Sequence, residues 1–175
     1  MAIDETRTFK PINIAVLTVS DTRTAENDTS GDILAERVNA AGHNLVARAI
    51  LKDDATLVAD RFNNWIDDPN VDAIISTGGT GLTGRDVTPE AIDMVKEKDI
   101  PGFGEVFRYL SLKTIGTSTV QSRACAAVSR GTYIFALPGS NGAVKDGWDG
   151  ILSEQLDSRN RPCNFVELMP RLTEK

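Results

Sequence analysis

The strongest chemical signal in the sequence is a glycine-rich turn, Gly78-Gly79-Thr80-Gly81, that follows a short apolar run. Glycines let the backbone approach an anion closely and turn successive N–H groups toward it, and the Thr80 hydroxyl adds a donor. Thr88 and Pro89 begin a predicted helix shortly afterwards, and its N-terminus would add positive potential. We therefore expect this turn to bind a phosphate or pyrophosphate. The alternative is a strand-to-helix turn that binds no ligand.

Gly79, Gly81 and Gly84 also match the G-x-G-x-x-G spacing of the dinucleotide-binding fingerprint. In that fingerprint the third glycine lies inside the helix, whereas here the helix is predicted to begin only at Thr88. The acidic residue that binds the ribose should end a second strand roughly 20 residues further on, where this chain has a predicted helix. No Gly-Lys-Ser/Thr follows the turn either, so we reject both the NAD-binding and the Walker A interpretations.

Two aspartates lie where they could hold a cation beside such an anion. Asp86 follows the glycine-rich turn, and a carboxylate next to a phosphate is unfavourable unless the two share a cation or a hydrogen bond. Asp53 follows the second predicted strand and is a candidate Mg²⁺ ligand in the same way. The alternatives are a turn residue or a partner of Arg85 for Asp86, and a helix cap for Asp53.

A hydroxyl-rich segment, 116–119, precedes Ser122 and Arg123. Arg123 could bind a phosphate through two parallel N–H groups, and Ser118 and Ser122 could donate hydrogen bonds to one. The alternative, which the residues alone favour, is that Ser118 caps a helix and Arg123 is solvated.

Histidine and cysteine chemistry is not indicated. The single histidine, His43, follows Gly42, which is predicted to end a helix, so we expect the histidine in a surface turn. A Ser-His-Asp or Cys-His centre is therefore not expected, and a zinc site has too few ligands. Cys125 is predicted to be a buried helix residue and Cys163 has no assignable role; two cysteines do not make a disulfide framework.

The elements that must position these residues alternate between strand and helix patterns. Apolar, β-branched runs predict buried strands, and apolar residues at helical spacing predict helices. The predicted strands are 12–19, 44–51, 71–77 and 132–137; the predicted helices are 30–41, capped by Ser30, then 57–66, one from 88 onward, 103–112, 119–129 and 144–156. This alternation predicts a mostly parallel sheet with helices on both faces.

Three of the predicted strands end in small or hydroxyl-bearing residues, at 18–21, 76–81 and 137–140. Ligands of such sheets bind beyond the carboxyl ends of the strands. We therefore expect the three strand ends to meet at one edge of the sheet and to form a single site.

The composition is that of an ordinary globular chain: 175 residues, 41% hydrophobic and 25% charged, with a net charge of −6. We expect one domain over 1–175, with terminal arms at 1–10 and 158–175. The negative charge is the wrong sign for a protein that binds nucleic acid by neutralising phosphates. No apolar run reaches the ~20 residues of a membrane span, and 1–10 lacks the core of a signal peptide, so we expect no membrane role and a cytoplasmic location.

As a set, these motifs resemble those of the MoaB/MogA family of molybdenum cofactor biosynthesis proteins. The resemblance runs from about residue 12 to residue 156. It is carried by LTVSD at 17–21, SG at 30–31, GGTGLTGRDVTPEA at 78–91, SR at 122–123 and LPGS at 137–140. The segments 102–108 and 115–119 and the tail 157–165 are similar to the MoaB branch in particular.

The resemblance implies a three-layer α/β/α sandwich that assembles as a trimer or hexamer and works with other proteins of the molybdenum cofactor pathway. It also implies a reaction, in which molybdopterin and ATP, with Mg²⁺, give adenylylated molybdopterin and pyrophosphate. Independently of the resemblance, we expect Phe103, Phe107, Tyr109 and Leu112 in the core or in subunit contacts and not in a base-stacking surface. The alternatives are a catalytically weak or inactive molybdopterin-binding carrier or scaffold, and an unrelated nucleotide-binding regulatory domain.

By position, the resemblance implies catalytic roles for Asp53, Asp86 and Ser122, with Asp53 as the Mg²⁺ ligand. The residues that it implies in substrate binding are Ser20, Asp21, Ser30, Gly31, Gly78, Gly79, Thr80, Gly81, Thr88, Glu90, Ser118, Arg123, Pro138, Gly139 and Ser140.

Overall fold

A six-stranded sheet in the order β2-β1-β3-β6-β5-β4 forms the centre of the computed structural model, which describes residues 3–174. The strands are β1 (Asn13–Val19), β2 (Asn44–Leu51), β3 (Ala73–Thr77), β4 (Lys98–Asp99), β5 (Cys125–Ser129) and β6 (Thr132–Leu137). Strands β2, β1, β3 and β6 are parallel, whereas β5 runs antiparallel to both β6 and β4. The prediction of a mostly parallel sheet is confirmed.

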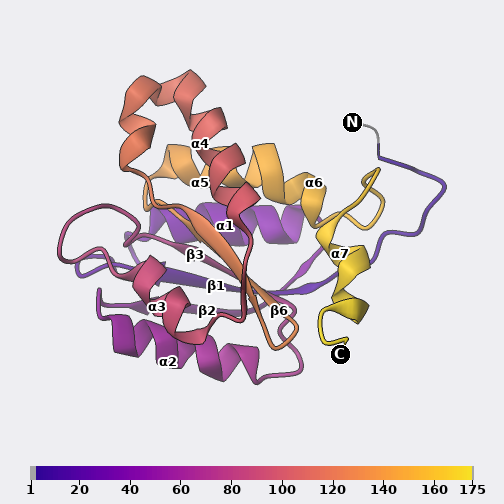
Figure 1. The fold of residues 1–175 in the computed structure, drawn as a ribbon, viewed down its shortest axis with the longest axis horizontal. Helices are drawn as coiled ribbons and strands as arrows, with labels where there is room; N and C mark the ends of the chain where they lie inside the picture. The colour runs from indigo at the N-terminus through magenta and orange to yellow at the C-terminus, as the bar shows by residue number, and fades with distance from the viewer. Residues whose placement is uncertain (1–2, 175) are drawn as a thin grey trace.

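Helices cover both faces of this sheet, as the alternation predicts (Figure 1). The helices are α1 (Thr29–Ala40), α2 (Ala55–Ile66), α3 (Thr88–Val95), α4 (Pro101–Ile115), α5 (Asn141–Gly147), α6 (Ser153–Gln155) and α7 (Phe165–Leu168), with short 3₁₀ or π segments η1 (Gly116–Gln121), η2 (Trp148–Leu152) and η3 (Met169–Arg171). Helices α1, α4 and α5 lie over one face and α2 and α3 over the other, so the three-layer α/β/α prediction is confirmed. No helix of residues 3–174 is long and apolar enough to cross a membrane.

The two hydrophobic cores follow from the period-two geometry of the strands. Along β1, Ile14 and Val16 face a cluster that contains Leu34 of α1, whereas Leu17 faces a second cluster with Phe62 of α2. Because both faces of the sheet are covered, the central strands are buried almost throughout, which is why they are continuous apolar runs in the sequence.

The carboxyl ends of β1, β3 and β6 lie side by side, because these three strands are neighbours in the sheet. Thr18 pairs with Thr77 across β1 and β3, and Thr77 pairs with Leu137 across β3 and β6. The expectation that the three polar strand ends meet at one edge is therefore confirmed.

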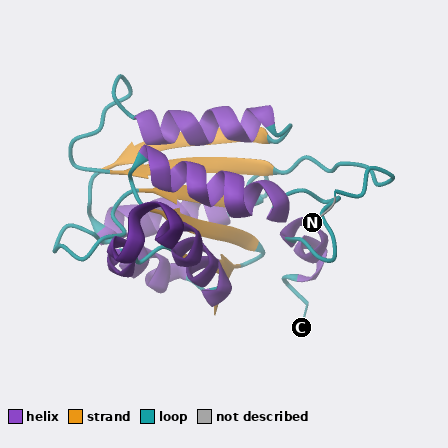
Figure 2. Ribbon diagram, turned by 90° about the horizontal axis from the view of Figure 1, so that it is seen from above, coloured by secondary structure: helices purple, strands orange, loops and turns teal. Residues whose placement is uncertain are grey.

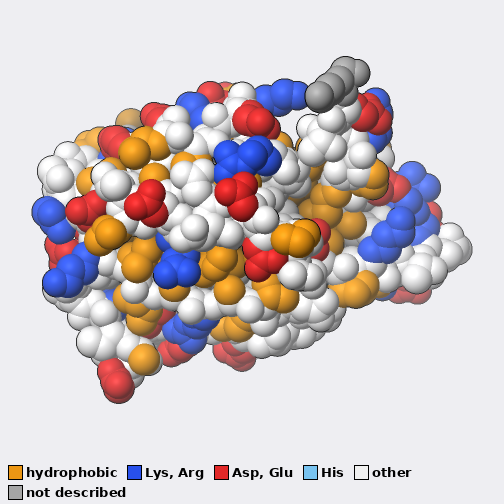
Figure 3. Space-filling model, turned by 90° about the horizontal axis from the view of Figure 1, so that it is seen from below, with side chains coloured by type: hydrophobic (Ala, Val, Ile, Leu, Met, Phe, Trp, Pro, Cys, Tyr) orange, Lys and Arg blue, Asp and Glu red, His pale blue; other side chains and the backbone are white. Residues whose placement is uncertain are grey.

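The two terminal segments pack against each other on one side of the molecule, where Figure 2 shows both chain ends. Ile3 forms an isolated bridge with Asn160, and Arg7 donates a hydrogen bond to the carbonyl of Ser158 at 2.9 Å and forms an ion pair with Glu167. Figure 3 shows the molecule from the side of α2, where acidic and basic side chains are interspersed among apolar ones.

The prediction of a helix over 119–129 is wrong. The end of this range is strand β5, and a hairpin turn at Arg130-Gly131 joins it to β6. Both turn residues have positive φ, 47° and 91°, as a tight two-residue hairpin requires. The alanine-rich run before the turn has high helix propensity, and pairing with the fully buried β6 overrides that local preference. Cys125 is thus a strand residue, and burial raises its pKa to about 11.

Two further local predictions are corrected. Asp28, not Ser30, caps α1, and its carboxylate accepts a hydrogen bond from the Gly31 amide at 3.0 Å. His43 does not lie in a surface turn: it is buried, its Nδ1 accepts a hydrogen bond from the Ile12 amide at 3.3 Å, and Phe9 packs against its ring. Burial lowers the pKa of His43, so the neutral ring suits this acceptor role.

Asp28 is a fully buried carboxylate that ties α1 to two strands. Besides capping the helix, it accepts hydrogen bonds from the Thr18 hydroxyl at 2.7 Å and from the Arg48 guanidinium at 2.8 Å. Burial by itself would raise the pKa of Asp28, but the hydrogen bonds from Arg48, Thr18 and Gly31 outweigh it and the pKa is lowered. The stability that this carboxylate supplies is therefore present at neutral pH and is lost as the pH falls through the lowered pKa.

Replacing Asp28 with alanine should lower the free energy of unfolding by about 2–4 kcal/mol, because the helix loses its cap and Thr18 and Arg48 lose their acceptor. Thermal unfolding followed by circular dichroism measures the change. Asp32→Ala is the matched control, since Asp32 pairs with the same Arg48 from an exposed position, and it should cost less than about 1 kcal/mol. Equal losses in the two variants would contradict the buried role.

Candidate functional site

Two adjoining cavities of different chemistry open at the edge where β1, β3 and β6 end. The polar cavity has a volume of about 390 Å³. The apolar cavity has a volume of about 320 Å³ and lies between α4, η1 and α5. Thr80, Gly81 and Pro138 line both, so the glycine-rich turn stands between the two spaces. The other residues of the polar cavity are Thr18, Val19, Ser20, Thr22, Arg23, Ser30, Asp53, Thr77, Gly78, Gly79, Asp86 and Gly139.

The glycine-rich turn needs its glycines for conformation and for space. Gly78 and Gly79 have φ of +98° and +64°, which favour glycine. A Cβ at Gly78 would overlap the carbonyl oxygen of Val19, and a Cβ at Gly139 would crowd the Cα of Gly78. Thr88 then fastens the turn to α3, because its hydroxyl donates to the Gly78 carbonyl at 2.8 Å and its amide donates to the Gly79 carbonyl at 2.9 Å.

The amides of this turn are not all available to a ligand. The Gly78 amide donates to the Leu137 carbonyl at 2.9 Å, and the backbone of Gly81 lies beside the Asp86 carboxylate and helps to lower its pKa. The amides of Gly79 and Thr80 have no acceptor among residues 3–174. Together with the Thr80 hydroxyl, they are the donors that the turn can offer to an anion.

The two predicted carboxylates, Asp53 and Asp86, line the polar cavity, and their pKa values are shifted in opposite directions. Burial raises the pKa of Asp53, and the negative charges of Asp21 and Asp86 raise it further. Burial also acts to raise the pKa of Asp86, but hydrogen bonds from the Thr83 hydroxyl at 2.6 Å and the Thr83 amide at 2.8 Å outweigh it and the pKa is lowered. Asp53 is thus a carboxylate whose ionised form a nearby cation would stabilise.

Arg123, which the sequence suggested as a phosphate ligand, and the neighbouring Arg85 are both held by the protein itself. Arg85 forms a bidentate pair with Asp21, at 2.8 and 2.9 Å. Arg123 forms an ion pair with Glu90 and donates to the carbonyls of Gly81 at 2.7 Å and Asp86 at 2.8 Å. Arg123 therefore clamps the glycine-rich turn and lies outside both cavities.

Arg23 is the cation that lines the polar cavity, and the sequence-based reasoning missed it. It lies in the loop after β1, and its guanidinium donates to the Asn27 carbonyl at 2.6 Å. The available signal was its place four residues beyond the end of a buried strand, but an arginine in a polar loop is ordinarily solvated.

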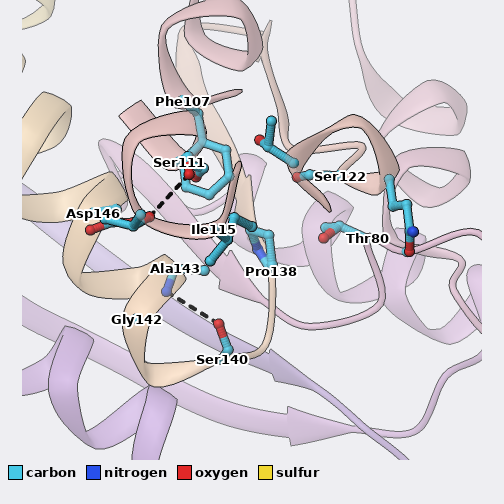
Figure 4. Close-up of a pocket in the computed structure, with 14 residues that line it drawn as sticks. Thr80, Phe107, Ser111, Ile115, Ser122, Pro138, Ser140, Gly142, Ala143 and Asp146 are labelled. Carbon is cyan, nitrogen blue, oxygen red and sulfur yellow. Dashed lines mark hydrogen bonds between the residues drawn. The ribbon is translucent and has the colours of Figure 1, made fainter. Parts of the chain in front are cut away.

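The apolar cavity has an aromatic and aliphatic wall and a polar residue at each end (Figure 4). Phe107 and Ile115 line its interior, Thr80 and Ser122 lie at the end next to the polar cavity, and Asp146 lies at the far end. The other lining residues are Gly81, Ser111, Thr114, Thr119, Gln121, Pro138, Ser140, Gly142 and Ala143. Asp146 had no functional interpretation in the sequence, and Phe107, expected in the core or a subunit contact, is a buried residue that also borders this cavity.

The structure thus brings most of the predicted site residues together and leaves some outside. The residues outside both cavities are Asp21, Gly31, Thr88, Glu90, Ser118 and Arg123. Five of these contact residues that line the cavities or the network behind them, whereas Ser118 is exposed in η1 and caps no helix. Ser140 both lines the apolar cavity and caps α5, where its hydroxyl accepts a hydrogen bond from the Ala143 amide at 3.2 Å.

Comparisons with known proteins agree with this architecture. Residues 15–158 match the family described as "Probable molybdopterin binding domain". The chain is 48% identical over 157 residues to molybdenum cofactor biosynthesis protein B of Escherichia coli K12, covering 90% of this chain and 92% of that protein. It is 40% identical over 159 residues to the protein of the same name from Bacillus subtilis, covering 89% and 94%.

The fold is also similar to that of solved structures. The crystal structure of a molybdenum cofactor biosynthesis protein B matches with a TM-score of 0.83 and 38% identity, over 86% of this chain and 94% of that one. Both the sequence and the α/β/α architecture therefore match over most of the chain, with the glycine-rich turn inside the matched range. The chain belongs to the MoaB/MogA family of molybdenum cofactor biosynthesis proteins.

Proposed function

We propose that the chain adenylylates molybdopterin: the terminal phosphate of molybdopterin attacks the α-phosphorus of ATP, the bond to the β-phosphate oxygen breaks, and pyrophosphate leaves. The observation that carries this proposal is the pair of adjoining cavities, one polar and one apolar, that share Thr80, Gly81 and Pro138. Such a pair suits molecules that join a flat ring to phosphates. Membership of the family supplies the pterin as the substrate class.

The residues of the polar cavity fit a magnesium ion. Asp53 and Asp86 line this cavity with carboxylate oxygens, which Mg²⁺ prefers, and a cation beside Asp53 would offset the burial and the negative charges that raise its pKa. No group of three metal-ligating side chains lies close enough to hold a metal within residues 3–174. This agrees with the way Mg²⁺ binds in phosphoryl-transfer sites, through one or two carboxylates and the phosphates of the substrate. When bound, it would neutralise negative charge on the phosphates.

The remaining work of the site is positioning and charge neutralisation, since the transfer needs little covalent help from the protein. The amides of Gly79 and Thr80 donate to phosphate oxygens, and Arg23 adds the positive charge that lines the same cavity. The Ser122 hydroxyl lies where the two cavities meet and orients the attacking phosphate. Arg123 and Thr88 act indirectly, because they hold the turn in place.

A second candidate is a molybdopterin-binding carrier that does not turn over. The observation that favours it is the engagement of Arg85 and Arg123 in ion pairs with Asp21 and Glu90. Arg23 is then the single cation lining the polar cavity among the described residues, which is little positive charge for two phosphate-bearing substrates. A carrier would bind molybdopterin and release no pyrophosphate.

We also propose that the chain self-associates, as the family resemblance implies, through the exposed apolar side of α4 and η1. Val106, Tyr109, Leu112, Ile115 and Val120 lie on this surface, and Val120 is 75% exposed. An apolar surface of this kind on a folded chain ordinarily marks a contact, and a second copy of the chain is the occupant that we propose.

Purified protein incubated with molybdopterin, Mg²⁺ and ATP should release pyrophosphate and form adenylylated pterin. Asp53→Asn should lower the rate at least about one-hundredfold, because the metal loses a carboxylate. It should not lower the melting temperature at neutral pH, since the fold disfavours the ionised form of Asp53.

Asp54→Ala is the matched control for that variant. Asp54 caps α2, accepting hydrogen bonds from the amides of Thr56 and Leu57 at 2.9 and 3.0 Å, and does not line either cavity. It should lose about 1 kcal/mol of stability and keep its turnover. Pterin binding without pyrophosphate release in the wild type would instead establish the carrier.

The carboxyl group of Asp53 should titrate above the ~3.9 of a free aspartate, because burial and the charges of Asp21 and Asp86 raise its pKa. Its contribution to stability has the opposite sign to that of Asp28: it favours the fold at acid pH and is lost as the pH rises through the raised pKa. Carboxyl carbon NMR measures the midpoint. Addition of Mg²⁺ with ATP should lower the midpoint of the Asp53 titration. A midpoint that does not change when Mg²⁺ is added would show that Asp53 is not a ligand of the metal.

The proposed contact surface can be tested with the double variant Tyr109→Glu/Leu112→Glu. Charges buried between copies would be unpaired, so the wild-type trimer or hexamer should fall to a smaller species in size-exclusion chromatography with light scattering. Met94→Glu on α3 is the control, since Met94 is equally exposed at 60% but lies on the other layer. An unchanged mass for the double variant would place the contact elsewhere.

A further inference from the structure

We propose that Asp146 determines which ring enters the apolar cavity: its carboxylate accepts two hydrogen bonds from the 2-amino group and N3–H of a pterin, so the cavity takes the pterin and not the adenine. This inference rests on the proposed function, in which a pterin and a nucleotide both bind at this edge of the sheet. It adds a specificity-determining residue that the sequence motifs do not include.

The geometry of the apolar cavity gives the bound ring a direction. Asp146 lies at the far end, and Thr80 and Ser122 lie at the end that joins the polar cavity (Figure 4). Thr114 lines the cavity beside Asp146, since the two side chains are in contact. Between them, the walls formed by Phe107, Ile115 and other apolar groups can hold a flat bicyclic ring. A volume of about 320 Å³ is at the lower end of the range for small-molecule sites.

The carboxylate of Asp146 makes few contacts with other polar groups of the protein. Its contact is the hydroxyl of Thr114 at 3.4 Å, which is near the outer limit of a hydrogen bond. Asp146 takes part in no ion pair among residues 3–174, although Lys113 and Lys145 border the outer groove that it also lines. The neighbouring Asp149, by contrast, is held in a bidentate pair by Arg37.

A carboxylate distinguishes the two rings by their hydrogen-bonding edges. A pterin presents two parallel donors, the 2-amino group and N3–H, which match the two acceptor oxygens of a carboxylate. The outer edge of adenine presents one donor and one acceptor, so a carboxylate would face the lone pair of N1. The side chain of a pterin leaves from the opposite end of the ring system. With its donor edge at Asp146, that tail points toward Thr80 and the polar cavity.

Titration of the protein with 6-hydroxymethylpterin, whose own fluorescence reports binding, tests the inference without ATP or turnover. Asp146→Asn should weaken pterin binding about tenfold to one-hundredfold, because the amide NH₂ faces a pterin donor and one charge-assisted hydrogen bond is lost. The same variant should bind adenosine monophosphate at least as well as the wild type does, since an amide matches the adenine edge. Asp146→Glu should keep the preference for the pterin.

Asp149→Asn is the matched control, because it removes a carboxylate outside the apolar cavity and should leave pterin affinity unchanged. The melting temperature of each variant shows that it is folded. Unchanged pterin affinity in Asp146→Asn would overturn the inference, and so would a wild type that binds adenosine monophosphate but no pterin. A protein that binds the pterin through Asp146 yet releases no pyrophosphate would contradict the adenylylation reaction alone.

Discussion

The close approach of three strand ends at Gly78 is the constraint on which the rest of the site depends. The Gly78 amide is bound by the Leu137 carbonyl of β6, and the Val19 carbonyl of β1 occupies the space of a side chain. This arrangement goes with a positive φ at the two successive residues Gly78 and Gly79, and the turn that they form lines the polar cavity. Any side chain at Gly78 would separate the strand ends, so the glycine-rich turn and the sheet edge form together.

If a chain with a net negative charge binds a polyanion, its positive electrostatic potential must be concentrated at the binding site. Here the arginines of the motif region do not supply it directly, because Arg85 and Arg123 are paired with carboxylates. They instead hold the glycine-rich turn and the segment after it in place through hydrogen bonds, which is the positioning that the proposed reaction needs. In the proposed reaction, the electrostatic work is shared by the amides of Gly79 and Thr80, by Arg23 and by a metal beside Asp53. Under that proposal, a chain with a net charge of −6 presents a local phosphate site in spite of its overall negative charge.

Much of the fold and of the polar cavity could be predicted from the sequence, because local pattern and tertiary structure agree there. The predicted strands at 44–51 and 132–137 have the observed bounds, and the residues around Gly78 and Asp53 meet as expected. Asp28 and His43 were misjudged because burial, which no local pattern encodes, decides their roles. Arg23 was missed for a related reason. A loop arginine belongs to no periodic sequence pattern, and only the path of the loop after β1 places it at the polar cavity.

The apolar cavity is the part of the site that the sequence encoded least, and the cause is specific. One of its walls is η1, which lies between α4 and β5, and β5 is the segment whose alanine-rich pattern indicates a helix. Pairing with β6 in the hairpin makes that segment a strand, so η1 is the connection between α4 and β5. The polar cavity therefore depends on glycine geometry, which motifs reveal, whereas the apolar cavity depends on how α4, η1 and α5 pack. Under the proposed assignment, ring specificity lies in Asp146 and the walls around it, where a substitution would change the preferred ring without altering the motifs of the polar cavity.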